Sequence, residues 1–196
     1  MFEAFGLEYC GLGLSDILNS GLLDGVPKLK HLSLKGNVIR TNESQKFSEL
    51  MLKVKDIDYL DLSENRMTDI RDDTFLPVTK LTFLNLASNK IKTVNWEFVR
   101  TLPDLQVLDM SNNEITSSIG MKSPLMSLTK LASFRIAENP FICSCEDIKD
   151  LQEIATMNPS SGLHVLTQLR QNSVQCTSPE ASKEWHVSDY YNSKCK

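Results

Sequence analysis

Residues 81–89 read Leu-Thr-Phe-Leu-Asn-Leu-Ala-Ser-Asn, and this stretch decides the fold because its pattern returns along the chain. The frame is LxxLxLxxN, with apolar residues at its first, fourth and sixth positions. Near-complete copies also begin at residues 29, 57, 105 and 131, and a degenerate copy runs from Phe2 to Cys10. The starts at 2, 29, 57, 81, 105 and 131 lie 27, 28, 24, 24 and 26 residues apart. Five near-complete copies of one frame predict a repeating architecture.

Each position of the frame has a structural reason. The central L-x-L alternates with the period of a β-strand, so both apolar residues point inward. Spacings of about 20–29 residues are typical of leucine-rich repeats, in which one strand per repeat joins a parallel sheet. The sequence therefore predicts an α/β solenoid, a leucine-rich-repeat arc whose strands line a concave face.

The ninth position of the frame carries an asparagine, whose amide can donate to and accept from backbone groups that a buried turn leaves unpaired. These ladder asparagines are Asn37, Asn65, Asn89, Asn113 and Asn139. Cys10 takes the same place in the first copy and is expected to be a small buried residue. The apolar residues expected to fill the convex side are Ile39, Met67, Ile91, Ile115, Phe47, Phe75 and Phe98.

The two ends of the repeat array differ. The first repeat is degenerate and uncapped, and the start lacks the pattern of a secretory signal, so we interpret the chain as a piece of a longer exported protein. The fifth repeat, which begins at residue 105, returns through Ser117–Pro124, which is expected to be a polar, flexible convex loop. About six repeats are predicted over residues 1–139, followed by a capping domain over 140–196.

The capping domain holds four of the five cysteines, at positions 143, 145, 176 and 195. Such crowding is typical of a disulfide-stapled module from an oxidising compartment, although four cysteines allow three pairings. A zinc site is the rival, and C-x-C matches the usual zinc spacing poorly. Residues 146–154 are apolar at 148, 151 and 154, which predicts a short amphipathic helix.

A family resemblance rests on LDLSEN (60–65), LNLASNKI (84–91), LDMSNNEI (108–115), NPFICSCE (139–146), QCTSP (175–179) and Cys195. Together these resemble the membrane-proximal end of a Toll-like receptor ectodomain with its cysteine-rich C-terminal cap. The resemblance implies the pairs Cys143–Cys176 and Cys145–Cys195. The cap departs from the family where 151–154 lacks the frequent tryptophan and where Pro159–Asn172 is long, so a divergent member is expected.

The resemblance implies a function as well. It implies an innate immune pattern-recognition receptor that binds a protein or microbial ligand and forms a homodimer or heterodimer through its C-terminal repeats and cap. The parent protein would be membrane-anchored, with this chain on the extracellular side of the plasma membrane or in the endosomal lumen. The alternatives are a secreted or adhesive leucine-rich-repeat binding protein and an antigen-binding repeat receptor of the jawless-vertebrate type, which the long 159–172 segment keeps open.

Other classes of function find little support. The histidines at 31, 164 and 186 are scattered, without a nucleophile motif or a glycine-rich phosphate loop, so no enzyme, cofactor or metal is expected. The net charge of −4 does not indicate a nucleic-acid ligand, and does not exclude one that binds a local basic patch.

The recognition surface is expected where variable frame positions face outward on the concave sheet. These candidates are Lys30, His31, Lys35, Asp58, Tyr59, Asp61, Phe83, Asn85, Val107, Asp109 and Arg135. The simpler interpretation is that the charged ones pair across strands and are solvated. Tyr59, Phe83 and Val107 are more suggestive because exposed aromatic side chains often anchor partners. Asn42-Glu43-Ser44 is a glycosylation sequon, expected on a loop at the edge of the arc.

Overall fold

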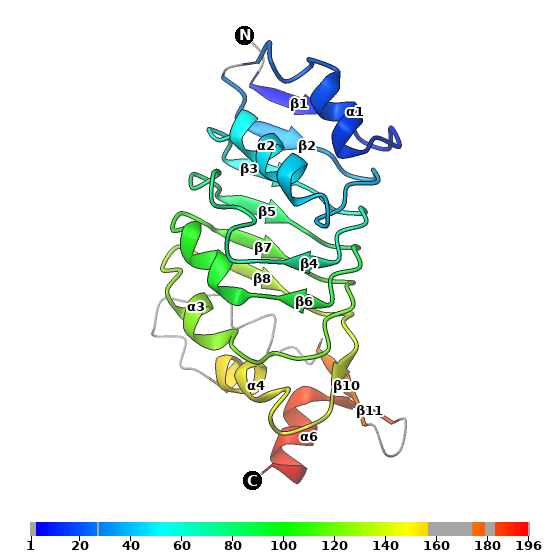
Figure 1. The fold of residues 1–196 in the computed structure, drawn as a ribbon. Helices are drawn as coiled ribbons and strands as arrows, with labels where there is room; N and C mark the ends of the chain where they lie inside the picture. The colour runs from blue at the N-terminus through cyan, green and yellow to red at the C-terminus, as the bar shows by residue number, and fades with distance from the viewer. Residues whose placement is uncertain (1–2, 27, 157–173, 179–182, 196) are drawn as a thin grey trace.

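The computed structural model describes residues 3–26, 28–156, 174–178 and 183–195. Within them the repeats form a stack, with one rung per repeat (Figure 1). The rungs share a six-stranded sheet, here called the main sheet, in which every neighbouring pair is parallel. Its strands, in spatial order, are β1 (Ala4–Gly6), β2 (His31–Ser33), β3 (Tyr59–Asp61), β5 (Phe83–Asn85), β7 (Val107–Asp109) and β8 (Ser133–Arg135). The predicted α/β solenoid with a parallel sheet is confirmed.

The register of the main sheet follows the repeat frame. Leu32 is the Cα partner of Leu60, which in turn is paired with Leu84, and the same column continues through Leu108 to Phe134. All five side chains are fully buried. Because equivalent residues stack on one another, each repeat completes the core of its neighbours, and the apolar frame positions hold the stack together.

Short helices and strands cover the side opposite the main sheet (Figure 1). They are α1 (Leu14–Asn19), α2 (Ser44–Lys53), the 3-10 helix η1 (Trp96–Thr101), α3 (Lys122–Met126) and the parallel pair β4 (Asp69–Ile70) and β6 (Thr93–Val94). Phe75 lies between Phe47 and Phe98, with ring centroids 5.9 and 5.7 Å away. All three rings are buried, as are Ile39, Met67, Ile91 and Ile115. The apolar residues expected on the convex side therefore form that half of the core.

The ladder asparagines join each rung to the one before it. In Asn89 the amide nitrogen donates to the carbonyl oxygens of Leu62 and Leu86, both at 3.0 Å. Its oxygen accepts from the backbone nitrogen of Met67 at 3.1 Å. Asn37, Asn65, Asn113 and Asn139 make the equivalent bonds. One buried amide per repeat thus satisfies three backbone groups.

The residue before the ninth frame position has a left-handed backbone in every rung. The φ values lie between 52° and 69°, and the residues are Tyr9, Gly36, Glu64, Ser88, Asn112 and Glu138. A left-handed conformation costs a non-glycine residue about 1–2 kcal/mol. In four rungs, those of Glu64, Ser88, Asn112 and Glu138, the hydrogen bonds of the following asparagine offset that cost, and in the rung of Gly36 a glycine avoids it.

Cys10 corrects one expectation, because its side chain is exposed and not buried. A ladder side chain is covered by the preceding rung, and no described rung precedes the first. The thiol of Cys10 instead donates to the carbonyl oxygen of Glu8 at 3.3 Å.

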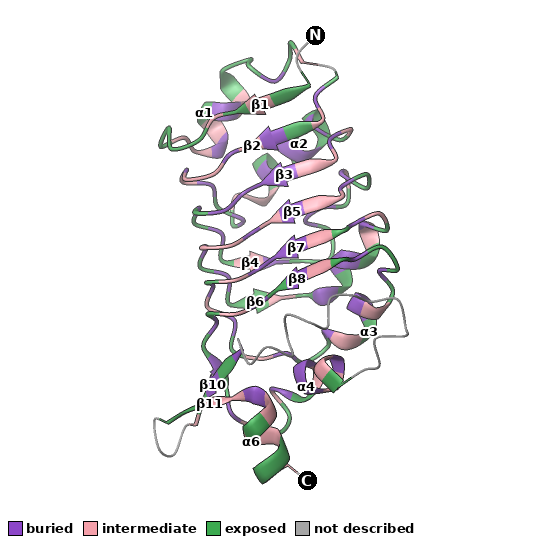
Figure 2. Ribbon diagram, turned by 180° about the vertical axis from the view of Figure 1, so that it is seen from behind, coloured by how far each residue is buried: buried purple, intermediate pink, exposed green. Residues whose placement is uncertain are grey.

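The C-terminal region forms a second, smaller sheet flanked by two helices (Figure 2). β10 (Gln175–Thr177) lies between the parallel β9 (Phe141–Ile142) and the antiparallel β11 (Glu184–His186), and the helices are α4 (Lys149–Thr156) and α6 (Val187–Lys194). Disulfides join Cys143 to Cys176 and Cys145 to Cys195, with Cα atoms 5.0 and 5.4 Å apart. The long segment Pro159–Asn172, with His164, lies outside the described residues.

The return segment Ser117–Pro124 of the repeat that begins at residue 105 packs against this region, which corrects the expected flexible loop. Ser118 is fully buried, and its backbone nitrogen and hydroxyl both donate to the carbonyl oxygen of Asp147 at 2.7 Å. The same hydroxyl accepts from the backbone nitrogen of Leu151 at 3.3 Å. Lys122 adds an ion pair with Glu153 at 2.7 Å. The polar residues of this segment suggested that it faces solvent. In the structure, the Ser118 hydroxyl instead bonds backbone groups near the start of α4.

Candidate functional site

Aromatic side chains line the face of the main sheet that is turned away from the helices, here called the sheet face. His31, Tyr59, Phe83 and Val107 are successive Cα partners, one per rung. The three rings, with the aliphatic Val107 at their end, are here called the aromatic strip. The rings of His31 and Tyr59 have centroids 5.5 Å apart, and those of Tyr59 and Phe83 are stacked at 4.2 Å. His31 is exposed and the other three are half-buried, as the partly buried residues along the strands in Figure 2 show.

The position of Tyr59 affects its chemistry. Burial raises the pKa of its hydroxyl above the ordinary value of 10.0, and the negative charge of Asp61 acts in the same direction. The ring therefore carries a neutral hydroxyl that can donate a hydrogen bond to a partner.

The neighbouring column of the sheet face is mostly structural, which corrects two candidates. Asp61 and Asp109 are buried, each with 8% of its surface exposed. One carboxylate oxygen of each accepts a backbone hydrogen bond two residues later, from Ser63 at 2.8 Å and Ser111 at 3.0 Å. Asn85 accepts from Ala87 in the same way. These side chains fold back to close a turn at the strand end, so little of them is left for a partner.

Polar contacts between rungs complete this column. The other oxygen of Asp61 accepts from the amide of Asn85 at 3.2 Å, and that of Asp109 lies 3.3 Å from the exposed guanidinium of Arg135. The sequence signal that could have found this role is the repeated Asp or Asn between the two inward residues of the strand, followed after two positions by a small residue.

Charged candidates of the first rungs pair across strands. Lys30 donates to the carbonyl oxygen of Asp56 at 3.0 Å, and His31 lies 3.4 Å from the carboxylate of Asp58. Lys35 lies 3.1 Å from Glu64. Exposed pairs of this kind contribute about 0–1 kcal/mol each. For these residues the simpler interpretation, pairing at a solvated surface, fits the contacts.

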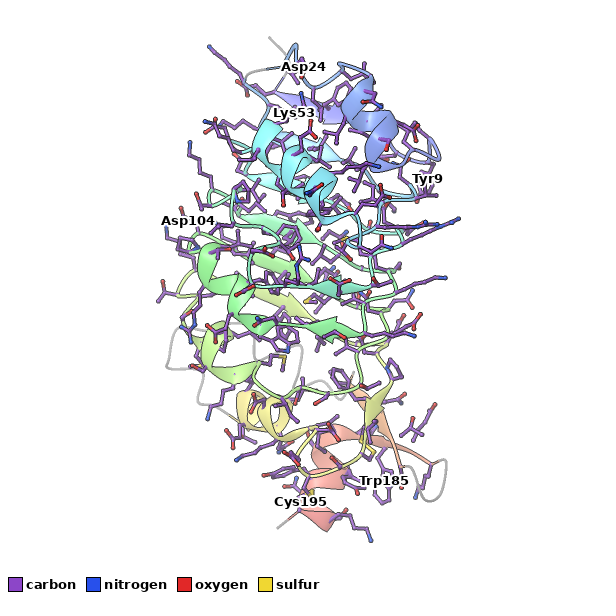
Figure 3. The ribbon with its side chains drawn as sticks, in the orientation of Figure 1. Tyr9, Asp24, Lys53, Asp104, Trp185 and Cys195 are labelled. Carbon is purple, nitrogen blue, oxygen red and sulfur yellow. A yellow bond between two sulfur atoms is a disulfide. The ribbon has the colours of Figure 1, made fainter. Side chains whose placement is uncertain are left out.

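Tyr9 is a residue that sequence reasoning missed, and it joins this charged group. It lies on the turn after β1 at the edge of the stack, and its hydroxyl donates to the Glu64 carboxylate at 3.1 Å (Figure 3). Lys35 lies 5.6 Å from the centre of its ring. The Tyr9 hydroxyl and, after it, Glu64 raise the pKa of Lys35 above its ordinary value.

The sequon residue Asn42 is exposed and lies on a turn after the second rung. It lines a groove of about 520 Å³, here called the edge groove, together with Arg40, Arg66, Thr68 and Lys90. Sequence reasoning named Asn42 alone, because the cations come from three different repeats.

Two features of the described structure bear on other functions. Within the described ranges, no group of three or more histidine, cysteine or acidic side chains is placed to hold a metal ion. Of the helices in the same part of the chain, none is both long and apolar enough to cross a membrane.

The sequence of the chain is similar to those of known leucine-rich-repeat proteins. The leucine-rich-repeat family model matches residues 55–115 and 80–139. CD180 antigen of Mus musculus is 29% identical over 145 residues, which are 71% of this chain and 20% of that protein. Toll-like receptor 6 of Homo sapiens is 29% identical over 203 residues, covering 93% of this chain and 24% of the receptor.

A further relative is lumican of Bos taurus, 31% identical over 119 residues, with 61% of this chain and 33% of lumican covered. The chain thus spans between a fifth and a third of the length of these three relatives. None of these three relatives is named as an enzyme.

Proposed function

Because the chain is a leucine-rich-repeat segment related to the ectodomains of Toll-like receptors, we propose that it is an extracellular recognition module of an innate immune pattern-recognition receptor. The observation that carries the proposal is the aromatic strip on the sheet face. Stacked aromatic side chains offer a large contact area whose rotamer entropy is already lost, which makes them good anchors for a partner. The expected partner is a protein or microbial ligand.

The second part of the proposal concerns assembly. We infer that this is the membrane-proximal part of the receptor and that its C-terminal repeats and cap form a homodimer or heterodimer when ligand binds. The hydrogen bonds of Ser118 support this idea, because they are buried and fix α4 to the repeat that begins at residue 105. A contact made by the cap would therefore be transmitted to the repeats as to one rigid body. Two disulfides fit an extracellular or endosomal location.

The proposal that the parent protein is a receptor is best tested by reading its coding sequence beyond Lys196. A membrane-spanning segment followed by a cytoplasmic signalling domain is the expected result. A stop codon or a lipid-anchor signal would overturn the receptor proposal and favour a secreted or adhesive repeat protein, the alternative with which the similarity to lumican is consistent.

The assembly is tested with the disulfide-intact chain under non-reducing conditions. Sedimentation velocity over a wide concentration range should show reversible dimer formation, and amide hydrogen exchange should show added protection at high concentration in β8, α4 or α6. A strict monomer at the highest concentration would contradict dimerisation by this segment. Protection confined to β1 and β2 would contradict the assignment of the dimer surface to the C-terminal end.

A further inference from the structure

The edge groove combines three cations from three successive rungs. Arg66 and Lys90 directly follow ladder asparagines, and their backbone nitrogens donate to the carbonyl oxygens of Ile39 and Met67, both at 3.0 Å. Arg40 lies in the rung before Arg66, three residues after Asn37, so it flanks the column of Arg66 and Lys90, whose equivalent residue in its own rung is Val38. Rungs of a sheet lie about 4.8 Å apart, so the three positions span about 10 Å along the edge. The next rung ends the series, because its equivalent residue is the acidic Glu114.

Within the described part of the chain, these three cations lack partners, whereas most other cations there are paired. Among the described residues, no carboxylate or other hydrogen-bonding group contacts the side chain of Arg40, Arg66 or Lys90. The acids nearest to them in the sequence are already engaged. The Asp69 carboxylate accepts from the hydroxyls of Thr41 and Thr68 at 3.1 and 2.9 Å.

Two further acids beside the groove are likewise engaged. Glu43 is paired with Lys46 at 2.9 Å and Glu114 with Lys92 at 3.2 Å. The groove therefore keeps a local positive charge on a chain whose net charge is −4.

We propose that the edge groove binds a sulfated polysaccharide. Guanidinium groups donate two parallel hydrogen bonds to oxyanions, and a row of cations about 10 Å long suits several sulfate groups on one linear chain better than a single small anion. The Asn42 amide and the Thr68 hydroxyl at the same groove can bond sugar hydroxyls.

The lining argues against a single-stranded nucleic acid. Such ligands are held largely by stacking of bases on aromatic side chains, and none of the five residues that line the groove is aromatic. The edge groove is also separate from the aromatic strip, so the proposal does not depend on what the sheet face binds.

The test uses the disulfide-intact chain carrying Ser44→Ala, which removes the sequon while leaving the Asn42 amide in place, so that no glycan can cover the groove. The probes are a heparin octasaccharide, a neutral dextran fragment of similar length and a single-stranded oligonucleotide of similar charge. Affinities are measured by calorimetry at about 0.15 M salt, where exposed charges are screened beyond about 8 Å. The heparin fragment should bind, more tightly than the oligonucleotide, and dextran should not bind.

A matched pair of variants locates the site. Arg40→Gln, Arg66→Gln and Lys90→Gln together should weaken heparin binding by about tenfold or more, because they remove all three cationic donors of the groove. The control is Lys28→Gln, Lys55→Gln and Lys194→Gln, which removes the same charge from exposed positions outside the groove. All six changes are at the surface, so thermal melting should confirm that both proteins fold.

Three outcomes would overturn the proposal. An equal loss in both triple variants would show attraction to diffuse charge and no defined site. An oligonucleotide that binds as tightly as heparin, with the same loss in the groove variant, would indicate a nucleic-acid surface. Absence of heparin binding by the folded protein would show that the edge groove is not a binding site for sulfated polysaccharides.

Discussion

The rings of Tyr59 and Phe83 lie parallel, with 7° between their planes and 4.2 Å between their centroids, although they belong to different repeats. The parallel register makes the two residues direct Cα partners, so the repeat frame alone brings them together. Their stack exists before any partner arrives. A ligand that covers it therefore loses little free energy in ordering side chains.

A double-mutant cycle should measure this stack. Tyr59→Ala and Phe83→Ala, alone and combined, should show a coupling of about 0.5–1.5 kcal/mol in the free energy of unfolding, the usual value for an aromatic pair. Denaturant unfolding is the measurement. The control cycle pairs Tyr59→Ala with Gln106→Ala, an exposed residue two rungs away, and should be additive. Additivity in the Tyr59–Phe83 cycle would contradict the stack.

A pH titration should show that the Tyr59 hydroxyl loses its proton at a higher pH than an ordinary tyrosine does. Burial raises the pKa of this hydroxyl above 10.0, so the folded state holds the proton more tightly than the unfolded state. The resulting stabilisation is fully present below the unfolded pKa and is lost as the pH rises above it. The absorbance of tyrosinate in the wild type minus that in Tyr59→Phe should therefore have its midpoint above 10.0. A midpoint at or below that value would disprove the burial.

Gly36→Ala should cost more stability than Gly11→Ala. Both glycines have a left-handed backbone, with φ of 69° and 67°. A Cβ at Gly36 would lie 2.3 Å from Cδ1 of Tyr9, whereas a Cβ at Gly11 would meet no atom within 4 Å. Gly11→Ala should thus lose only the backbone cost of about 1–2 kcal/mol. Gly36→Ala should lose about 1 kcal/mol more, because Tyr9 must leave its contacts with Glu64 and Lys35.

Thermal or denaturant unfolding measures both losses. In a Tyr9→Ala background the excess cost of Gly36→Ala should vanish. Equal losses for the two glycines in the native background would show that Tyr9 does not occupy the space beside Gly36.

Ser118→Ala should loosen the joint between the repeats and the cap. The change leaves the buried backbone nitrogen of Leu151 without its acceptor, which costs about 1–3 kcal/mol. Amide exchange in α4 should rise together with the loss of stability. Ser117→Ala is the control: its hydroxyl accepts one exposed bond from Ile119, so it should cost within about 0.5 kcal/mol. Similar losses of stability for both serine variants would contradict the role of Ser118 in holding the cap to the repeats.

Much of the fold could be predicted because the repeat frame determines the register. Once Leu60 and Leu84 are placed at equivalent frame positions, their pairing, the outward direction of Tyr59 and Phe83 and the neighbourhood of the ladder asparagines all follow. These are local rules repeated at a fixed spacing, so one well-read repeat predicts the next.

The errors arose where a side chain acts through a contact that the frame does not encode. Asp61 and Asp109 occupy outward strand positions, yet their carboxylates turn back to the chain two residues later. Ser118 bonds a carbonyl oxygen 29 residues away, in a region with a different pattern. The edge groove was missed because Arg40, Arg66 and Lys90 are unremarkable singly, and Arg40 occupies a different position of the repeat from the other two, so only the folded chain brings them to one groove.

The asparagine ladder also has a consequence for how such chains change in length. Each asparagine bonds its own rung and the one before it, and the units that begin at residues 57 and 81 are both 24 residues long. Duplication or loss of one whole unit in the gene would leave every remaining amide with an equivalent carbonyl to bond. The units that begin at residues 29 and 105 are 28 and 26 residues long and keep the same ladder bonds, so their convex return segments accept a few extra residues. An insertion between the strand and its asparagine would break the series. The arc therefore changes its reach in steps of one rung, while the return segments can vary in length.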